Sequence, residues 1–157
     1  TARLASLTLV GAVGITADGK PIPDIFRMPE AENLRRFYAD PDRAERRLVD
    51  LAKLSANPAD MAIVAKNRAT VMRLAYRPRF HNPGLAQWLH RIDVPTLLIW
   101  GEHDRLFPKE YALAYQRLIP GSKAVIIPEC GHLPQVEKVD AFTAELESFI
   151  GAMRIAA

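Results

Sequence analysis

Two polar side chains in the second half of the sequence have the chemistry and spacing to move a proton. Asp104 lies in the stretch WGEHDRLFP, and His132 lies in the stretch IPECGHLPQVE. An imidazole takes up and returns protons near neutral pH. A carboxylate that accepts a hydrogen bond from one ring nitrogen fixes the tautomer and stabilises the imidazolium. The two stretches therefore predict an Asp–His pair, provided that the fold brings them together.

Each of these stretches follows a short apolar segment that is typical of a buried strand. The segments are VPTLLIW (94–100) and KAVIIP (123–128), and an amphipathic segment at 108–119 separates them. A second amphipathic segment follows, with an apolar stripe made of Phe142, Leu146, Phe149, Ile150 and Met153. Alternating strands and helices predict an α/β fold with a parallel sheet, in which the carboxyl ends of neighbouring strands meet at one edge.

The middle of the chain has a different pattern. Three helices are predicted at 29–39, 41–55 and 58–76, and an Asp-Pro and an Asn-Pro pair mark the starts of the last two. No strand pattern interrupts them, so residues 24–81 are predicted to form an all-helical insertion. The continuous apolar run at 4–14 predicts one more buried strand. Residues 1–23 and 82–157 would then form the α/β core.

The bulk composition fits one globular domain. The chain has 157 residues, of which 49% are hydrophobic and 25% charged, with a formal net charge of +3. Basic and acidic residues alternate, which disfavours a nucleic-acid surface. A single cysteine excludes an internal disulfide and favours the cytoplasm. No run reaches the roughly 18 apolar residues of a membrane span, and the spacing of the four histidines predicts neither a metal site nor a cofactor.

The two strand–loop stretches, over about residues 90–150, resemble the C-terminal half of the α/β-hydrolase fold. The resemblance implies that Asp104, in the Gly-x-x-Asp loop after the seventh strand of that fold, is the acid, and that His132, in the Gly-His after the eighth, is the base. It also implies that the strand at 4–14 is the sixth strand and that residues 24–81 are the inserted cap. The expected activity is hydrolysis of an ester, a lactone or a similar carbonyl substrate.

One part of the family pattern is absent from the sequence. The family places its nucleophile on a Gly-x-Ser-x-Gly elbow that precedes acid and base, and no such elbow occurs here. We therefore expect the nucleophile (Ser, Cys or Asp) upstream of Thr1, in an N-terminal half that would be this segment's partner. Alone, the 157-residue chain is expected to be inactive and to associate with itself through the strand near 4–14. The alternative is a non-catalytic fragment, or a ligand-binding or interaction member of the same fold.

Three other polar residues near these loops, Asp18, Cys130 and Glu137, are less suited to these roles. Asp18, after the first strand, is a second candidate for the acid. Cys130 directly precedes Gly131 and His132 and is expected to be a semi-buried packing residue, because neighbouring residues on an extended turn point apart. Glu137 is expected to stabilise the start of the last helix. An apolar substrate pocket is expected from residues that also fit a helix core: Phe37, Met72, Tyr76, Phe80, Trp88 and Leu133.

Overall fold

A three-stranded parallel sheet forms the centre of the computed structural model, which describes residues 3–17 and 19–156. The strands are β1 (Leu7–Val10), β2 (Thr96–Gly101) and β3 (Lys123–Ile127), in the order β1-β2-β3. All six residues of β2 are buried, whereas β1 is half-buried throughout. A central parallel strand is covered on both faces, which explains the uninterrupted apolar run in β2. The α/β architecture predicted from the sequence is confirmed.

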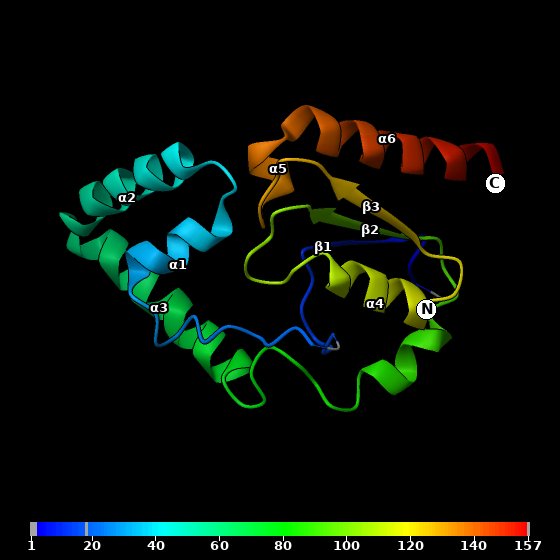
Figure 1. Ribbon diagram of the computed structural model, residues 1–157, viewed down its shortest axis with the longest axis horizontal. Helices are drawn as coiled ribbons and strands as arrows, with labels where there is room; N and C mark the ends of the chain where they lie inside the picture. Colours follow the sequence, from blue (N-terminus) through cyan, green and yellow to red (C-terminus); the bar gives the residue numbers. More distant parts are fainter. Residues whose placement is uncertain (1–2, 18, 157) are drawn as a thin grey trace.

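Helices cover both faces of this sheet (Figure 1). Leu98 and Trp100 of β2 belong to one core with Tyr111 and Tyr115 of α4 (Glu110–Leu118). The alternate β2 residues, Leu97 and Ile99, belong to a second core, against which apolar side chains of α6 (Val139–Ala156) pack. Because successive side chains of a strand point to opposite faces, β2 joins the two layers. Phe142, Leu146 and Phe149 of the predicted stripe pack on the second core.

Three helices lie beside the sheet at the left of Figure 1. They are α1 (Glu30–Phe37), α2 (Pro41–Ser55) and α3 (Pro58–Ala75). The Asp40 carboxylate accepts a hydrogen bond from the backbone N–H of Asp42, and the Asn57 side chain accepts one from Ala59, so the predicted N-caps are present. The short helix η1 (Ala86–Arg91) leads the chain back to β2.

The first strand is shorter than the sequence predicted. A strand was expected over 4–14, but β1 ends at Val10 because Gly11 turns the backbone to a φ of +51°. A further short helix, α5 (Pro134–Glu137), precedes α6 and carries the chain out of the His132 loop. In the described part of the chain, no helix has the length and apolar character needed to cross a membrane.

Candidate active site

The loop after β2 holds the Asp104 side chain in a buried position. The Asp104 side chain has no solvent exposure. Its Oδ1 accepts hydrogen bonds from the backbone N–H groups of Leu106 and Phe107, both at 2.9 Å. The indole Nε1 of Trp100 donates to the Phe107 carbonyl at 2.8 Å, which ties the loop to β2. Asp104 therefore has one oxygen held by the backbone and one oxygen left for a partner.

That partner is His132, on the loop after β3. The distance between His132 Nδ1 and Asp104 Oδ2 is 2.8 Å, so the pair predicted from the sequence is brought together. The imidazole is 16% exposed and contacts two aromatic rings, with ring centroids 5.3 Å from Phe37 and 5.6 Å from Phe107. When Nδ1 carries the proton that Asp104 accepts, Nε2 of the neutral ring holds the lone pair that can take a proton.

Glycines allow the three loops at this edge to approach one another. A Cβ added to Gly11 would lie 2.8 Å from His132 Cε1, closer than real Cβ atoms come. A Cβ on Gly101 would overlap the backbone of Cys130 and Gly131. Gly11 was not among the predicted site residues; the signal for it is its position inside the apolar run, because glycine in a strand pattern often marks a close approach.

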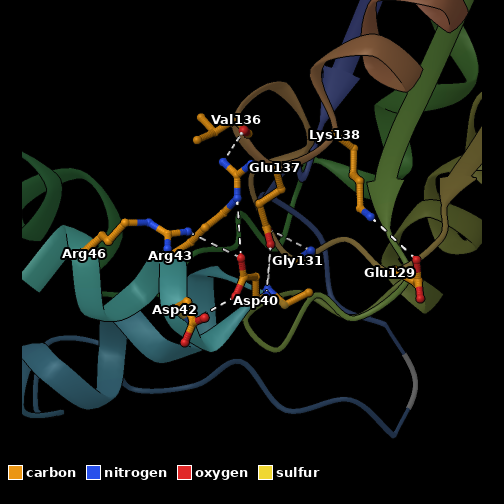
Figure 2. A network of polar contacts seen from close by, with 10 residues as sticks. Asp40, Asp42, Arg43, Arg46, Glu129, Gly131, Val136, Glu137 and Lys138 are labelled. Atoms are coloured by element: carbon orange, nitrogen blue, oxygen red, sulfur yellow. Dashed lines mark hydrogen bonds and ion pairs between the residues drawn. The ribbon is translucent and has the colours of Figure 1, made fainter.

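Glu137 has a different role from the expected one. It does not stabilise the start of the last helix: its carboxylate accepts hydrogen bonds from the backbone N–H groups of Gly131 at 2.9 Å and Ala39 at 2.7 Å (Figure 2). The longer bond from the Asp40 N–H is 3.4 Å. The side chain therefore connects the His132 loop with the segment between α1 and α2.

The neighbouring Cys130 and His103 lie outside this arrangement. Cys130 is a free cysteine with no exposed surface, more deeply buried than expected. Burial, and next the negative charge of Glu137, raise the pKa of its thiol to about 12, so the reactive thiolate is disfavoured. His103 is exposed beside Glu102. Among the described residues, no three His, Cys, Asp or Glu side chains converge as metal ligands would.

Three of the predicted pocket residues belong to an aromatic row that ends at His132. Phe37 contacts the imidazole directly. Phe80 stacks on Phe26 at 5.3 Å and meets the edge of Phe107 at 5.7 Å, and Phe107 contacts His132. Tyr76 reaches this row through Phe26, at 5.7 Å. The row joins aromatic side chains of the helical segment to Phe107 of the core, next to His132.

The other predicted pocket residues lie elsewhere, apart from Leu133. Met72 is 40% exposed on α3, and Trp88 is 55% exposed with the Arg91 guanidinium over its ring. Leu133 lines an open groove of about 450 Å³, together with Leu34, Phe37, Tyr38, Arg47 and Val136. Asp18, the second candidate for the acid, lies outside the described residues.

Comparison with known protein families gives one match over most of the chain. Residues 24–139 match the model of a family described as alpha/beta hydrolase fold. The matched range includes α1 to α3, β2, β3 and both loops of the Asp104–His132 pair.

Individual relatives match shorter stretches. The 2-hydroxy-6-oxononadienedioate/2-hydroxy-6-oxononatrienedioate hydrolase of Klebsiella pneumoniae subsp. pneumoniae is 35% identical over 68 residues, which cover 43% of this chain and 24% of that protein. The 2-hydroxy-6-oxo-6-(2'-aminophenyl)hexa-2,4-dienoic acid hydrolase of Metapseudomonas resinovorans is 34% identical over 71 residues, 45% of this chain and 23% of that protein.

A similar fold is present in a solved structure, that of the meta-cleavage product hydrolase of Pseudomonas fluorescens IP01. It has a TM-score of 0.72 at 20% identity, and the likeness covers 96% of this chain. The chain corresponds to 57% of that hydrolase. It therefore spans little more than half of its structural neighbour and about a quarter of the curated relatives that it matches.

Proposed function

This chain belongs to the alpha/beta hydrolase fold family, and on that premise we propose that Asp104 and His132 are the acid and base of a hydrolase. The observation that carries the proposal is the 2.8 Å hydrogen bond between His132 Nδ1 and the fully buried Asp104 side chain. A buried carboxylate is stable only when its oxygens are used, and here both are: two backbone N–H groups hold one and the imidazole holds the other.

The pair would work with a nucleophile that lies outside these 157 residues, since the sequence contains no Gly-x-Ser-x-Gly elbow. His132 Nε2 would accept the proton of the nucleophile as that group attacks a carbonyl carbon, and Asp104 would stabilise the imidazolium. The imidazolium would return the proton to the leaving group. In the second half of the reaction, His132 would take a proton from water as the water attacks the acyl intermediate. The imidazolium would then give that proton to the nucleophile as it leaves.

The helical segment 24–81 would act as a cap over this pair. The aromatic row through Phe80 and Phe37 supports a substrate with an apolar part next to its carbonyl carbon. The named relatives act on 2-hydroxy-6-oxo acids. We therefore place ketone-bearing acids of this kind first, with hydrolysis at the 6-oxo carbonyl. Simple esters and lactones need the same acid–base pair and are the second substrate class.

The test uses the protein expressed from its complete reading frame. His132→Gln should lower kcat by about 10³-fold or more on a 4-nitrophenyl ester and on a 2-hydroxy-6-oxo-dienoate, because loss of a member of such a triad removes most of the chemical acceleration. His103→Gln is the matched control, since its exposed ring lies next to Asp104 in the sequence and takes no part in the pair. Thermal unfolding of both variants checks that each is folded.

A His132→Gln enzyme that keeps kcat within tenfold of the His103→Gln control would contradict the assignment of the base. The relative kcat/KM on the two substrates separates the two substrate classes, because a pocket built for the dienoate should prefer it over the small ester.

A further inference from the structure

Residues 37–40, the last residue of α1 and the linker to α2, are held by the loops that carry Asp104 and His132. We call this segment the α1–α2 junction. The backbone N–H of His132 donates to the Phe37 carbonyl at 2.8 Å. The Arg105 guanidinium donates to the carbonyl of Tyr38 at 3.3 Å. The N–H of Ala39 donates to Glu137 at 2.7 Å, so three consecutive junction residues each have a bond to this edge of the core.

Glu137 is the side chain that connects the two sides. Its Oε1 accepts the N–H of Gly131, the residue before His132, and its Oε2 accepts the N–H of Ala39 (Figure 2). The residue is only 8% exposed, and within the described ranges no lysine or arginine forms an ion pair with it. Its charge is therefore compensated mainly by backbone N–H groups. Hydrogen bonds to an ionised group are stronger than those between neutral groups.

The α1–α2 junction and the His132 loop are in close contact at Gly131. A Cβ added to Gly131 would lie 2.6 Å from Ala39 N, from Phe37 O and from Glu137 Oε1. The Phe37 ring also meets the His132 imidazole edge-on. Arg43, in the first turn of α2, donates to the Val136 carbonyl of α5 at 2.9 Å. A displacement of the junction would therefore break the bond to the His132 backbone N–H and the bond to the Glu137 carboxylate, which also holds Gly131.

We propose that Glu137 is a positioning residue that couples the placement of the α1–α2 junction to the orientation of His132. With the junction docked, Glu137 holds Gly131, and the His132 ring lies in line with Asp104. With the junction displaced, the loop loses the bonds of Phe37 and Ala39, and the imidazole loses its alignment. The coupling is a property of the fold; its effect on catalysis rests on the function proposed above.

The test is Glu137→Gln, again in the protein from the complete reading frame. A carboxylate offers two oxygens to two N–H groups, whereas the amide offers one oxygen and turns an NH₂ group toward the other N–H. One of the two connections is therefore lost without a change of size. Glu129→Gln is the matched control: it makes the same chemical change in the loop before α5, at a side chain that is 84% exposed and forms an ion pair with Lys138 (Figure 2).

Three measurements should change in Glu137→Gln and not in Glu129→Gln. Amide hydrogen exchange at Ala39 or Gly131 should accelerate about tenfold or more, as expected when a buried charge-assisted bond is lost. The downfield proton resonance of His132 Nδ1–H should broaden or shift. In turnover, kcat should fall about tenfold while KM changes less than about twofold, because a misplaced base affects the chemical step.

Unchanged exchange at both amides together with an unchanged Nδ1–H resonance in Glu137→Gln would overturn the proposal. So would a lower melting temperature with wild-type kcat per folded molecule, since that is the signature of a structural role alone. The wild-type protein provides a further check that needs no variant. If the amides of Ala39 and Gly131 exchange at unprotected rates, the hydrogen bonds from these amides to Glu137 are absent in solution. Because exchange and resonance need no substrate, a failure of the assigned reaction would not be mistaken for a failure of the coupling.

Discussion

Replacing Gly11 by alanine should disturb the Asp104–His132 pair by direct contact. Gly11 follows β1 and has a φ of +51°, and the space where its Cβ would stand is taken by the imidazole. The added carbon would lie 2.8 Å from His132 Cε1 and 3.0 Å from Nδ1. The substitution therefore has two separable effects, a backbone strain and a displacement of the ring.

The size of each effect follows from the geometry. Alanine in the left-handed region costs about 1–2 kcal/mol of the free energy of unfolding. Ordinary carbon contacts begin near 3.4 Å, so the ring must retreat by about 0.6 Å. Asp104 cannot readily follow, because two N–H groups hold its other oxygen. The 2.8 Å bond would then exceed the usual length, and kcat/KM should fall about 10- to 100-fold.

Gly121→Ala is the matched control. Gly121 has a φ of +72°, and nothing lies within 4 Å of the place of its Cβ, so it has the same backbone strain without the contact. The free energy of unfolding, measured by urea titration, should fall by similar amounts in the two variants. Only Gly11→Ala should lose activity. If the two variants have kcat/KM values within about threefold of each other, the ring is not held against Gly11, and the reasoning is refuted.

Two further predictions concern the edge strand and a buried hydroxyl. The 157-residue chain alone should be inactive and should associate through β1, an edge of the sheet; light scattering that shows a stable monomer would contradict this. Burial raises the pKa of Tyr115 from 10.0 to about 12, and its hydroxyl donates to the Val13 carbonyl. Because the unfolded chain loses the tyrosine proton at a lower pH than the folded protein, the free energy of unfolding should fall between about pH 10 and pH 12, by up to about 1.4 kcal/mol per pH unit. In Tyr115→Phe, urea titrations should show this part of the fall to be absent. An identical pH slope in the variant would disprove the prediction.

The fold and the central pair could be predicted because local patterns determine them. The run at 94–100 has no charged residue, as is typical of a central parallel strand, and the Asp-Pro and Asn-Pro signals mark the starts of α2 and α3. Parallel neighbours place their carboxyl ends at one edge, so the Asp104 and His132 loops had to meet there. No detail of side-chain packing was needed for this inference.

Glu137 could not be assigned correctly from the sequence because its partners are distant. Ala39 lies 98 residues before it, and the acceptor role depends on how the helical segment docks on the core. From sequence alone, an acidic residue just before a helix is expected to stabilise the N-terminus of that helix. The short turn of α5 instead directs the Glu137 side chain back toward Gly131. Trp88 was expected to line the pocket, but its ring is exposed on the surface, which the sequence pattern did not reveal.

The two buried carboxylates of this edge act on different parts of the same residue. Asp104 binds the His132 ring and is itself held by its own loop, so its position depends on local backbone only. Glu137 binds the backbone before the ring, and its other oxygen depends on the α1–α2 junction. The His132 ring stays aligned with Asp104 only while the backbone of the His132 loop stays in place. The backbone N–H of His132 donates to Phe37, and Gly131 is held by Glu137, which in turn is bonded to Ala39, so the helical segment takes part in orienting His132.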